Sequence, residues 1–196
     1  MPWDTERTRR RLKEAAVAEF AEHGFAGTKM TSIAARAGIN KERLYSYFGD
    51  KRALWEQVLA DELDALATAV EVGGVGLDDI GEFAGATYDY HAEHPKLARL
   101  LQWEGLMGGP AADAETRAAH YREKVARFAQ AQEDGVLNAD LAAAHLVFAL
   151  IALAAWWQTV PQLAALITGR DSTDRTEQLR RRAFVVAAAQ RLAAAP

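Results

Sequence analysis

Cysteine is absent from this chain of 196 residues, and proline is scarce, with five residues. The absence of cysteine excludes a disulfide framework, a thiolate metal site and a cysteine nucleophile. The sequence also lacks a phosphate-binding loop of the P-loop type and a serine nucleophile motif. We therefore expect neither a catalytic site nor a cofactor.

A long, strongly apolar run is missing as well. The nearest candidate covers residues 141–157, reads LAAAHLVFALIALAAWW, is rich in alanine and includes His145. A membrane-spanning helix needs about 20 strongly apolar residues, so we interpret this segment as a helix buried all round within the protein. The N-terminus has arginines but no apolar core of signal-peptide type. We expect a cytoplasmic protein without a membrane partner.

The two signs of charge are unevenly distributed along the chain. The formal net charge is −4, which by itself argues against nucleic acid as a partner. However, residues 1–55 hold 11 Lys and Arg against 7 Asp and Glu, a net of +4, and residues 56–196 hold 12 against 20, a net of −8. A basic segment on an acidic remainder indicates that this segment alone meets a polyanion, although chance clustering would give the same counts.

Glycine and proline lie between segments of helical hydrophobic periodicity, which predicts an all-α fold of about nine or ten helices. The first helix is expected over residues 5–23, where Leu12, Ala16 and Phe20 repeat at intervals of four and Gly24 follows the end. The other helices are expected at about residues 30–37, 41–48, 51–72, 77–93, 95–106, 112–133, 138 or 140 to 160, and 173–192.

The second and third of these helices carry the most informative pattern. Gly38 can adopt a positive φ at no steric cost, Ile39 is an apolar residue within the turn, and Asn40 is a good N-cap for the next helix. Leu44 and Phe48 lie about 40° apart around the third helix and define its inward face. This arrangement predicts a helix-turn-helix, whose second helix enters the major groove of DNA.

The other side of the third helix carries groups that can contact DNA. Arginine suits bidentate contacts with guanine, and glutamate can accept from N4 of cytosine, whereas tyrosine and lysine commonly reach phosphates. For Tyr45, partial packing against the first helix is an alternative. The outward residues are Glu42, Arg43 and Ser46, flanked by Lys41, Tyr45 and Tyr47.

Residues from about 9 to 59 resemble the DNA-binding part of the tetracycline-repressor-like (TetR) family of regulators. The matching run is AAVAEFAEHGFAGTKMTSIAARAGINKERLYSYFGDKRALWEQVL. One helix-turn-helix pattern is a weak signal, but many matches at fixed spacing are specific. The matches are Ala15, Ala16, Phe20, Gly24, Phe25, Thr28, Ile33, Ala34, Ala37, Gly38, Ile39, Leu44, Tyr45, Tyr47, Phe48, Lys51 and Leu54.

The resemblance implies an N-terminal three-helix helix-turn-helix domain over residues 1–50 and a C-terminal helical ligand-binding and dimerisation domain over residues 51–196. It also implies a homodimeric repressor that binds a palindromic double-stranded DNA operator and releases it when a small-molecule inducer binds the C-terminal domain. Glu42 joins the predicted DNA contacts from its place on the outward face. Carried over by position, the other contacts are Thr28, Lys29, Thr31, Lys41, Arg43, Tyr45, Ser46, Tyr47 and Lys51.

Three positions need a separate explanation. The family often has Ser or Thr in place of Lys29, so Thr28 is an alternative cap for the second helix. It often has a small residue in place of Glu42, where an acid either reads cytosine or repels a phosphate. Lys51 begins a helix, where a cation is poorly placed for the helix dipole, so we expect an external anion such as a phosphate to explain it.

Aromatic and polar groups alternate in the middle helices and are candidates for a ligand pocket, although aromatic residues at helical spacing are also typical of a plain core. His91 and His94 could offer two metal ligands, but a solvated helix end before Pro95 is the simpler interpretation, and we predict no metal site. The pocket candidates are Phe83, Tyr88, His91, Trp103, Met107, Tyr121, Phe128 and Trp156.

Two apolar stripes are candidates for the dimer interface, since two helices from each protomer would form a four-helix interface with two-fold symmetry. The alternative for the first stripe is a helix buried inside one monomer. The stripes consist of Leu146, Leu150, Leu153 and Trp157 in one helix, and of Phe184, Ala188 and Leu192 in the last helix.

The leading hypothesis is a ligand-responsive, DNA-binding transcriptional regulator. One alternative is a small-molecule-binding helical protein without operator binding, which Glu42 alone favours. The other is an all-α enzyme, which the lack of a catalytic constellation disfavours. The inducer, the operator sequence and the choice between repressor and activator stay open.

Overall fold

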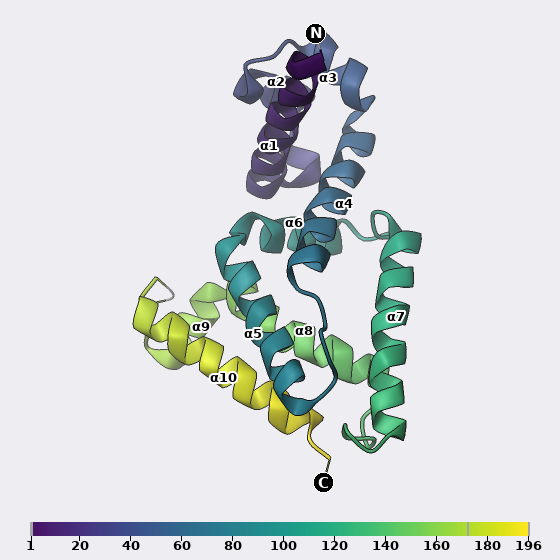
Figure 1. Cartoon of the computed structure of the whole chain (residues 1–196). Helices are drawn as coiled ribbons and strands as arrows, with labels where there is room; N and C mark the ends of the chain where they lie inside the picture. The colour runs from purple at the N-terminus through teal and green to yellow at the C-terminus, as the bar shows by residue number, and fades with distance from the viewer. Residues whose placement is uncertain (1, 172, 196) are drawn as a thin grey trace. The chain divides into compact units, whose positions relative to one another are not determined.

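The structure, a computed structural model, describes residues 2–171 and 173–195. Within that part of the chain it contains ten α-helices and no strand (Figure 1). The all-α prediction is therefore confirmed.

Four helices lead the chain: α1 (Pro2–Gly27), α2 (Met30–Ala37), α3 (Lys41–Phe48) and α4 (Lys51–Ala69). Regular geometry in α1 is interrupted at Gly24, which has φ 66 and ψ 179, close to the end predicted from this glycine. A Cβ atom there would lie 2.7 Å from the Trp103 ring. Both the positive φ and the nearby ring therefore require glycine.

Six helices follow: α5 (Leu77–Glu93), α6 (Pro95–Met107), α7 (Ala114–Glu133), α8 (Ala143–Thr159), α9 (Pro161–Thr168) and α10 (Arg175–Ala193). The sequence analysis did not predict α9. Pro161 stands at its beginning, where proline is favoured because no intrahelical N–H is needed. The axes of α8 and α9 are bent by 88° relative to each other.

The chain divides into two compact units. The first, here called the head, runs through Ala65 and also includes Lys96–Ala114; the second, the body, comprises Leu66–Pro95 and the residues from Glu115 onward. Helix α4 begins in the head and ends in the body, and α6 belongs to the head. The boundary predicted after residue 50 thus falls inside the head, because α4 contributes Trp55 and Leu59 to the head core.

Aromatic side chains hold the centre of the head core. The ring of Phe20 meets that of Trp55 edge to face at a centroid distance of 5.0 Å, and Phe25 meets the same ring at 5.9 Å. Such edge-to-face pairs are favourable beyond the apolar area that they bury. Leu44 and Phe48 of α3 pack into the same cluster, which fixes the orientation of α3.

Helices α5 and α10 form the main packing of the body. Two buried glycines one turn apart on α5 make the close approach possible. A Cβ at Gly81 would lie 2.9 Å from Nε2 of Gln190, and one at Gly85 would lie 3.0 Å from Cγ2 of Val186. A larger side chain at either position would require Gln190, Arg182 or Val186 of α10 to move.

Helix α8 has a buried side and an exposed side. Leu146, Leu150 and Ala154 are fully buried, whereas Phe148 and Trp156 are exposed by 74% and 56%. The interpretation of this segment as a helix buried all round is therefore wrong for the single chain. Within the described residues, no single helix is long and apolar enough to cross a membrane, and α8 with α9 reaches that threshold only as a bent pair.

Candidate nucleic-acid interface

Residues of defined backbone geometry set the turn between α2 and α3. Gly38 follows α2 in the left-handed conformation (φ 63, ψ 36), and its N–H donates to the carbonyl of Ala35 at 3.0 Å. Asn40 caps α3, because its Oδ1 accepts from the N–H of Arg43 at 2.9 Å. Ile39, between them, packs against the head core. The predicted helix-turn-helix is therefore confirmed.

Helix α3 turns one side to the core and the other to solvent. Leu44 and Phe48 are buried, and the guanidinium of Arg9 lies 5.2 Å from the centroid of the Phe48 ring. The opposite side exposes charged and hydrogen-bonding groups to solvent, in the orientation predicted from the sequence. Its exposed residues are Lys41, Glu42, Arg43, Tyr45 and Ser46.

The two tyrosines of α3 lie in different surroundings. Tyr45 is exposed, and its ring centroid lies 5.4 Å from the ammonium nitrogen of Lys41. Tyr47 is partly buried against the head core, with its ring centroid 6.2 Å from that of Phe48. The partial packing considered for Tyr45 therefore applies to Tyr47, and Tyr45 is the more accessible of the two.

The residues around the start of α2 also differ in burial. Thr28 is buried, and its hydroxyl donates to the carbonyl oxygens of Gly24 at 2.7 Å and Glu19 at 3.0 Å. The prediction that the Thr28 side chain contacts DNA is therefore wrong, since it secures the end of α1. Lys29 and Thr31 are exposed. Lys29 is the N-cap of α2 and has no capping side-chain hydrogen bond, so the alternative cap at Thr28 is not formed.

Lys51 finds its partners within the head. Its Nζ donates to the carbonyl oxygens of Phe25 at 2.8 Å and Thr28 at 3.0 Å, and lies 4.5 Å from the centroid of the Phe25 ring. Carbonyl groups at the end of a helix attract cations. These carbonyls explain a lysine at the start of α4 without the external anion that we expected.

Two arginines fasten α2 to α1, and the sequence analysis did not identify either. Nε of Arg36 donates to Glu19 at 2.6 Å and Nη2 to Glu22 at 2.9 Å, and these carboxylates raise the pKa of Arg36. Nη2 of Arg11 donates to the carbonyl of Ala37 at 2.7 Å. Opposite charges on consecutive helices are visible in the sequence, but their pairing depends on the crossing of the helices.

The residues predicted to line a ligand pocket have very different surroundings. Trp103 and Met107 belong to the head, where the indole N–H of Trp103 donates to the carbonyl of Ala21 at 3.3 Å. For the buried members, the alternative of a plain core is correct, and the set as a pocket lining is not supported. Phe83, Tyr88, His91 and Phe128 are buried, whereas Tyr121 and Trp156 are exposed.

Two buried polar atoms of α5 have no hydrogen-bond partner among the described residues: the hydroxyl of Tyr88 and Nδ1 of His91. Burial raises the pKa of Tyr88, and burial together with the nearby His94 lowers the pKa of His91. The described part of the chain contains no cluster of three or more side chains suited to hold a metal ion.

The apolar stripes predicted for the dimer interface are only partly available. Leu146 and Leu150 are fully buried inside the body, so their prediction as interface residues is wrong and the monomer-core alternative is correct. Leu153, Trp157, Ala188 and Leu192 are half-buried, and Phe184 is exposed. The exposed large apolar residues of α8, α9 and α10, here called the apolar face, are Phe148, Trp156, Leu163, Leu166, Ile167, Leu179 and Phe184.

A compact head with a capped helix-turn-helix and an exposed polar recognition helix, joined to a larger helical body, defines a helix-turn-helix DNA-binding protein. The chain belongs to the TetR family of bacterial transcriptional regulators. The family model described as "Bacterial regulatory proteins, tetR family" matches residues 12–58, and that described as "Tetracyclin repressor-like, C-terminal domain" matches residues 79–191.

Characterised proteins support the same assignment. The chain is 44% identical over 169 residues to the HTH-type transcriptional repressor SCO4008 of Streptomyces coelicolor, a match that covers 85% of this chain and 86% of that protein. It is 33% identical over 102 residues to the HTH-type transcriptional regulator RutR of Escherichia coli K12, which covers 50% of this chain and 48% of RutR.

Solved structures share the whole fold. The crystal structure of the transcriptional regulator SCO4942 from Streptomyces coelicolor has 30% sequence identity and a TM-score of 0.80, covering 96% of this chain and 99% of that one. A TetR-family regulator from Marinobacter aquaeolei has 19% identity and a TM-score of 0.74, covering 99% of both chains, and is similar in fold alone.

Proposed function

We propose that this ligand-responsive transcriptional regulator is a homodimeric repressor that binds a palindromic operator through α3 and is released from it by a small-molecule inducer. The observation that carries the DNA-binding part is the exposed polar side of α3. Its inner residues are fixed in the head core, so the outer residues are presented by a rigid element.

The exposed residues of α3 divide into base-reading and phosphate-binding groups. Arg43 and Glu42 lie in the first turn of the recognition helix, where side chains reach base edges. Arginine pairs with guanine, and glutamate accepts from cytosine. Lys41, Tyr45 and Ser46 flank them and suit phosphate oxygens. Lys29 and Thr31 add exposed groups around the start of α2.

The apolar face supports the dimer. Phe148 and Trp156 lie eight residues apart on one side of α8, and Leu166, 82% exposed, lies on α9. An exposed apolar surface of this extent is typical of a protein interaction site. Two copies joined about a two-fold axis would bury it and present two recognition helices to two half-sites.

An inducer would release the operator by shifting the population between dimer conformations that can and cannot bind DNA. A ligand that binds better to a dimer whose two heads misfit successive major grooves lowers the population that can bind DNA. Because α4 begins in the head and ends in the body, ligand contacts at its C-terminal end have a continuous helix through which to act.

A DNA mobility-shift assay with the DNA upstream of the gene tests this function. We expect salt-sensitive binding that prefers this DNA over random sequence. Arg43→Ala should lower that preference by about tenfold, because a lost bidentate base contact costs about 1–3 kcal/mol. Lys96→Ala, which removes an exposed charge of the head outside α3, should preserve it. The absence of sequence-selective binding by the wild-type chain would contradict the proposal.

A further inference from the structure

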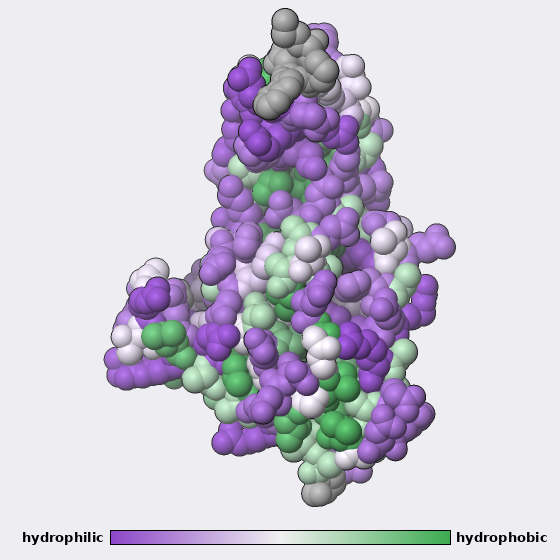
Figure 2. All heavy atoms as spheres, in the orientation of Figure 1, coloured by the Kyte–Doolittle hydropathy of each residue, from purple (hydrophilic) through white to green (hydrophobic). Residues whose placement is uncertain are grey.

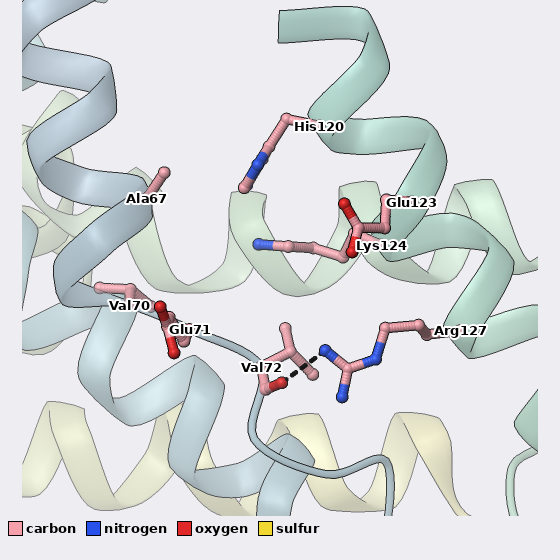
Figure 3. Close-up of a pocket in the computed structure, with 8 residues that line it drawn as sticks. All are labelled: Ala67, Val70, Glu71, Val72, His120, Glu123, Lys124 and Arg127. Carbon is pink, nitrogen blue, oxygen red and sulfur yellow. Dashed lines mark hydrogen bonds between the residues drawn. The ribbon is translucent and has the colours of Figure 1, made fainter.

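A cavity of about 290 Å³ opens in the body between the C-terminal end of α4, the segment that follows it, and one side of α7 (Figure 3). Its volume lies near the lower end of the range for small-molecule sites. Ala67, Val70 and Val72 give it an apolar wall. The sequence analysis did not identify it, because the lining is made of small and charged residues rather than aromatic ones.

Basic side chains line the α7 side of the cavity. His120, Lys124 and Arg127 recur at intervals of four and three residues, so they lie on one face of the helix. In Figure 3 the side chains of His120 and Lys124 both extend from α7 into the space in front of α4. The cavity therefore combines an apolar wall with a facing row of nitrogen groups.

Lys124 is the most unusual of these residues. Its Nζ lies 4.5 Å from the ring centroid of Phe83, and the side chain is half-buried. Among residues 2–171 and 173–195, no carboxylate lies within ion-pair distance of this nitrogen. Burial and the nearby Arg127 lower the pKa of Lys124. The ammonium is thus held at a free-energy cost that an anion in the cavity would offset.

Arg127 has a different role, although it lies on the same side. Its Nη1 donates to the carbonyl of Val72 at 2.6 Å and its Nη2 to that of Gly73 at 3.0 Å. These bonds hold the segment after α4 against α7, and Figure 3 shows the one between Arg127 and Val72. Arg127 adds positive charge to the cavity, and two of its five N–H donors are used by these backbone carbonyls.

Two carboxylates of the cavity could instead favour a cationic ligand. Glu71 and Glu123 are both exposed, so water already solvates them and little free energy is gained by pairing them. Lys124 is half-buried, with its ammonium over the Phe83 ring. The less solvated charge has more to gain from a partner, which favours an anion.

We propose that the cavity binds a small organic acid whose carboxylate pairs with Nζ of Lys124 and whose apolar part lies against Ala67, Val70 and Val72. The proposal names the chemical class of the inducer and to that extent rests on the proposed function. Binding itself does not depend on DNA, so the two can be tested separately.

Isothermal titration calorimetry on the full chain tests the ligand class with three probes that share a phenyl ring and differ in charge: benzoate, benzamide and benzylamine. We expect benzoate to bind and benzamide, the neutral counterpart, to bind at least about tenfold more weakly, because a charge-assisted hydrogen bond is lost. Tighter binding of benzylamine than of benzoate would overturn the proposal and assign the cavity to cations through Glu71 and Glu123.

Variants identify the residue. Lys124→Gln should weaken benzoate binding by about tenfold or more, and Lys124→Arg should retain most of it. Arg122→Gln, which removes one exposed charge of α7 outside the cavity, should leave it unchanged. Circular dichroism should show the same helicity for all three. Equal benzoate affinity in the wild type and Lys124→Gln would overturn the assignment.

A separate experiment tests whether the cavity controls DNA binding: benzoate is added to the preformed protein–DNA complex, and release of DNA is measured. Release of DNA from the wild type but not from Lys124→Gln supports both proposals. Binding of benzoate by calorimetry with no release contradicts the regulatory role of the site while supporting the ligand class. Absence of DNA binding from the start contradicts the proposed function and leaves the calorimetric test intact.

Discussion

The head and the body differ in what they leave exposed. In the helix-turn-helix part of the head, the large apolar side chains described for α1 to α3 are buried or partly buried in one core, and Tyr45 is the one of them that is exposed. The other exposed large apolar side chains of the head, Leu106 and Met107, lie on α6. In the body, α8, α9 and α10 expose a set of phenylalanine, tryptophan and leucine side chains. Figure 2 shows one face of the molecule, with hydrophilic atoms over most of the head and a mixture of hydrophobic and hydrophilic atoms on the body.

These exposed groups determine what each unit can bind. A charged polyanion is recognised by groups that remain hydrated until contact, and α3 supplies such groups. A second protein chain is recognised by burying apolar area from water, and the apolar face supplies that area. One chain thus carries a polar surface and an apolar surface. Substitutions that remove charge from the first or add charge to the second test what each surface binds.

The largest effect is expected from a charge placed in the apolar face. Phe148→Glu puts a carboxylate into each half of a symmetric interface, and burying such charges without partners costs several kcal/mol. We expect a monomer by sedimentation velocity and the loss of operator binding, with unchanged helicity. Ala119→Glu adds the same charge to an exposed position of α7 and should remain dimeric. A dimeric Phe148→Glu chain would exclude the apolar face as the interface.

The next effect concerns the rigidity of the head. Gly24→Ala should lower the free energy of unfolding by about 3 kcal/mol, because alanine is strained at this positive φ and its Cβ would meet the Trp103 ring. Gly49→Ala is the matched control, with φ 71 and no atom within 4 Å of the added Cβ. Urea unfolding measures both. Equal losses for the two variants would show that the Trp103 contact contributes nothing.

A smaller effect is expected for Lys51→Met. Losing two hydrogen bonds from a charged group should cost about 2 kcal/mol of stability in the free protein. Lys29→Met removes an exposed lysine of the same region and should cost little. If Lys51→Met instead leaves the melting temperature unchanged and lowers only the salt dependence of DNA binding, Lys51 is a phosphate contact after all.

The smallest effect is a dependence on pH. The pKa of His91 is lowered in the folded chain, so between that value and the ordinary value of about 6.5 the unfolded chain binds more protons. Stability from this group is therefore complete above pH 6.5 and is lost as the pH falls toward the lowered pKa. His91→Phe should reduce the drop in melting temperature between neutral and mildly acidic pH, whereas His23→Phe, at an exposed position, should not. If the melting temperature of His91→Phe fell by as much as that of the wild type, His91 would not be the source of this pH dependence.

Local signals made the head predictable. Gly38 and Asn40 determine the turn through their own backbone conformation and capping bond, and a spacing of four residues suffices to place Leu44 and Phe48 inward. The partners of Lys51 lie 23 and 26 residues away. No local pattern could show that carbonyl groups, rather than a phosphate, accept its hydrogen bonds.

The body was less predictable for a physical reason. Helix α8 is apolar on two sides: Leu146 and Leu150 lie on one, and Phe148 and Trp156 on the other. Positions two residues apart lie about 200° apart around a helix, so an almost wholly apolar sequence does not show which side is buried. The cavity beside Lys124 was not predicted, because the burial of this lysine and its lack of an ion pair among the described residues depend on how α4 and α7 pack.

A hydroxyl-radical footprint of the chain on DNA selected from a random pool tests whether α3 reads DNA in two copies joined through the body. We predict two protected segments related by two-fold symmetry, with centres separated by about one helical turn of 10–10.5 bp or a multiple of it. A single protected segment would contradict this arrangement. So would a footprint that does not depend on the DNA sequence and is unchanged in Arg43→Ala.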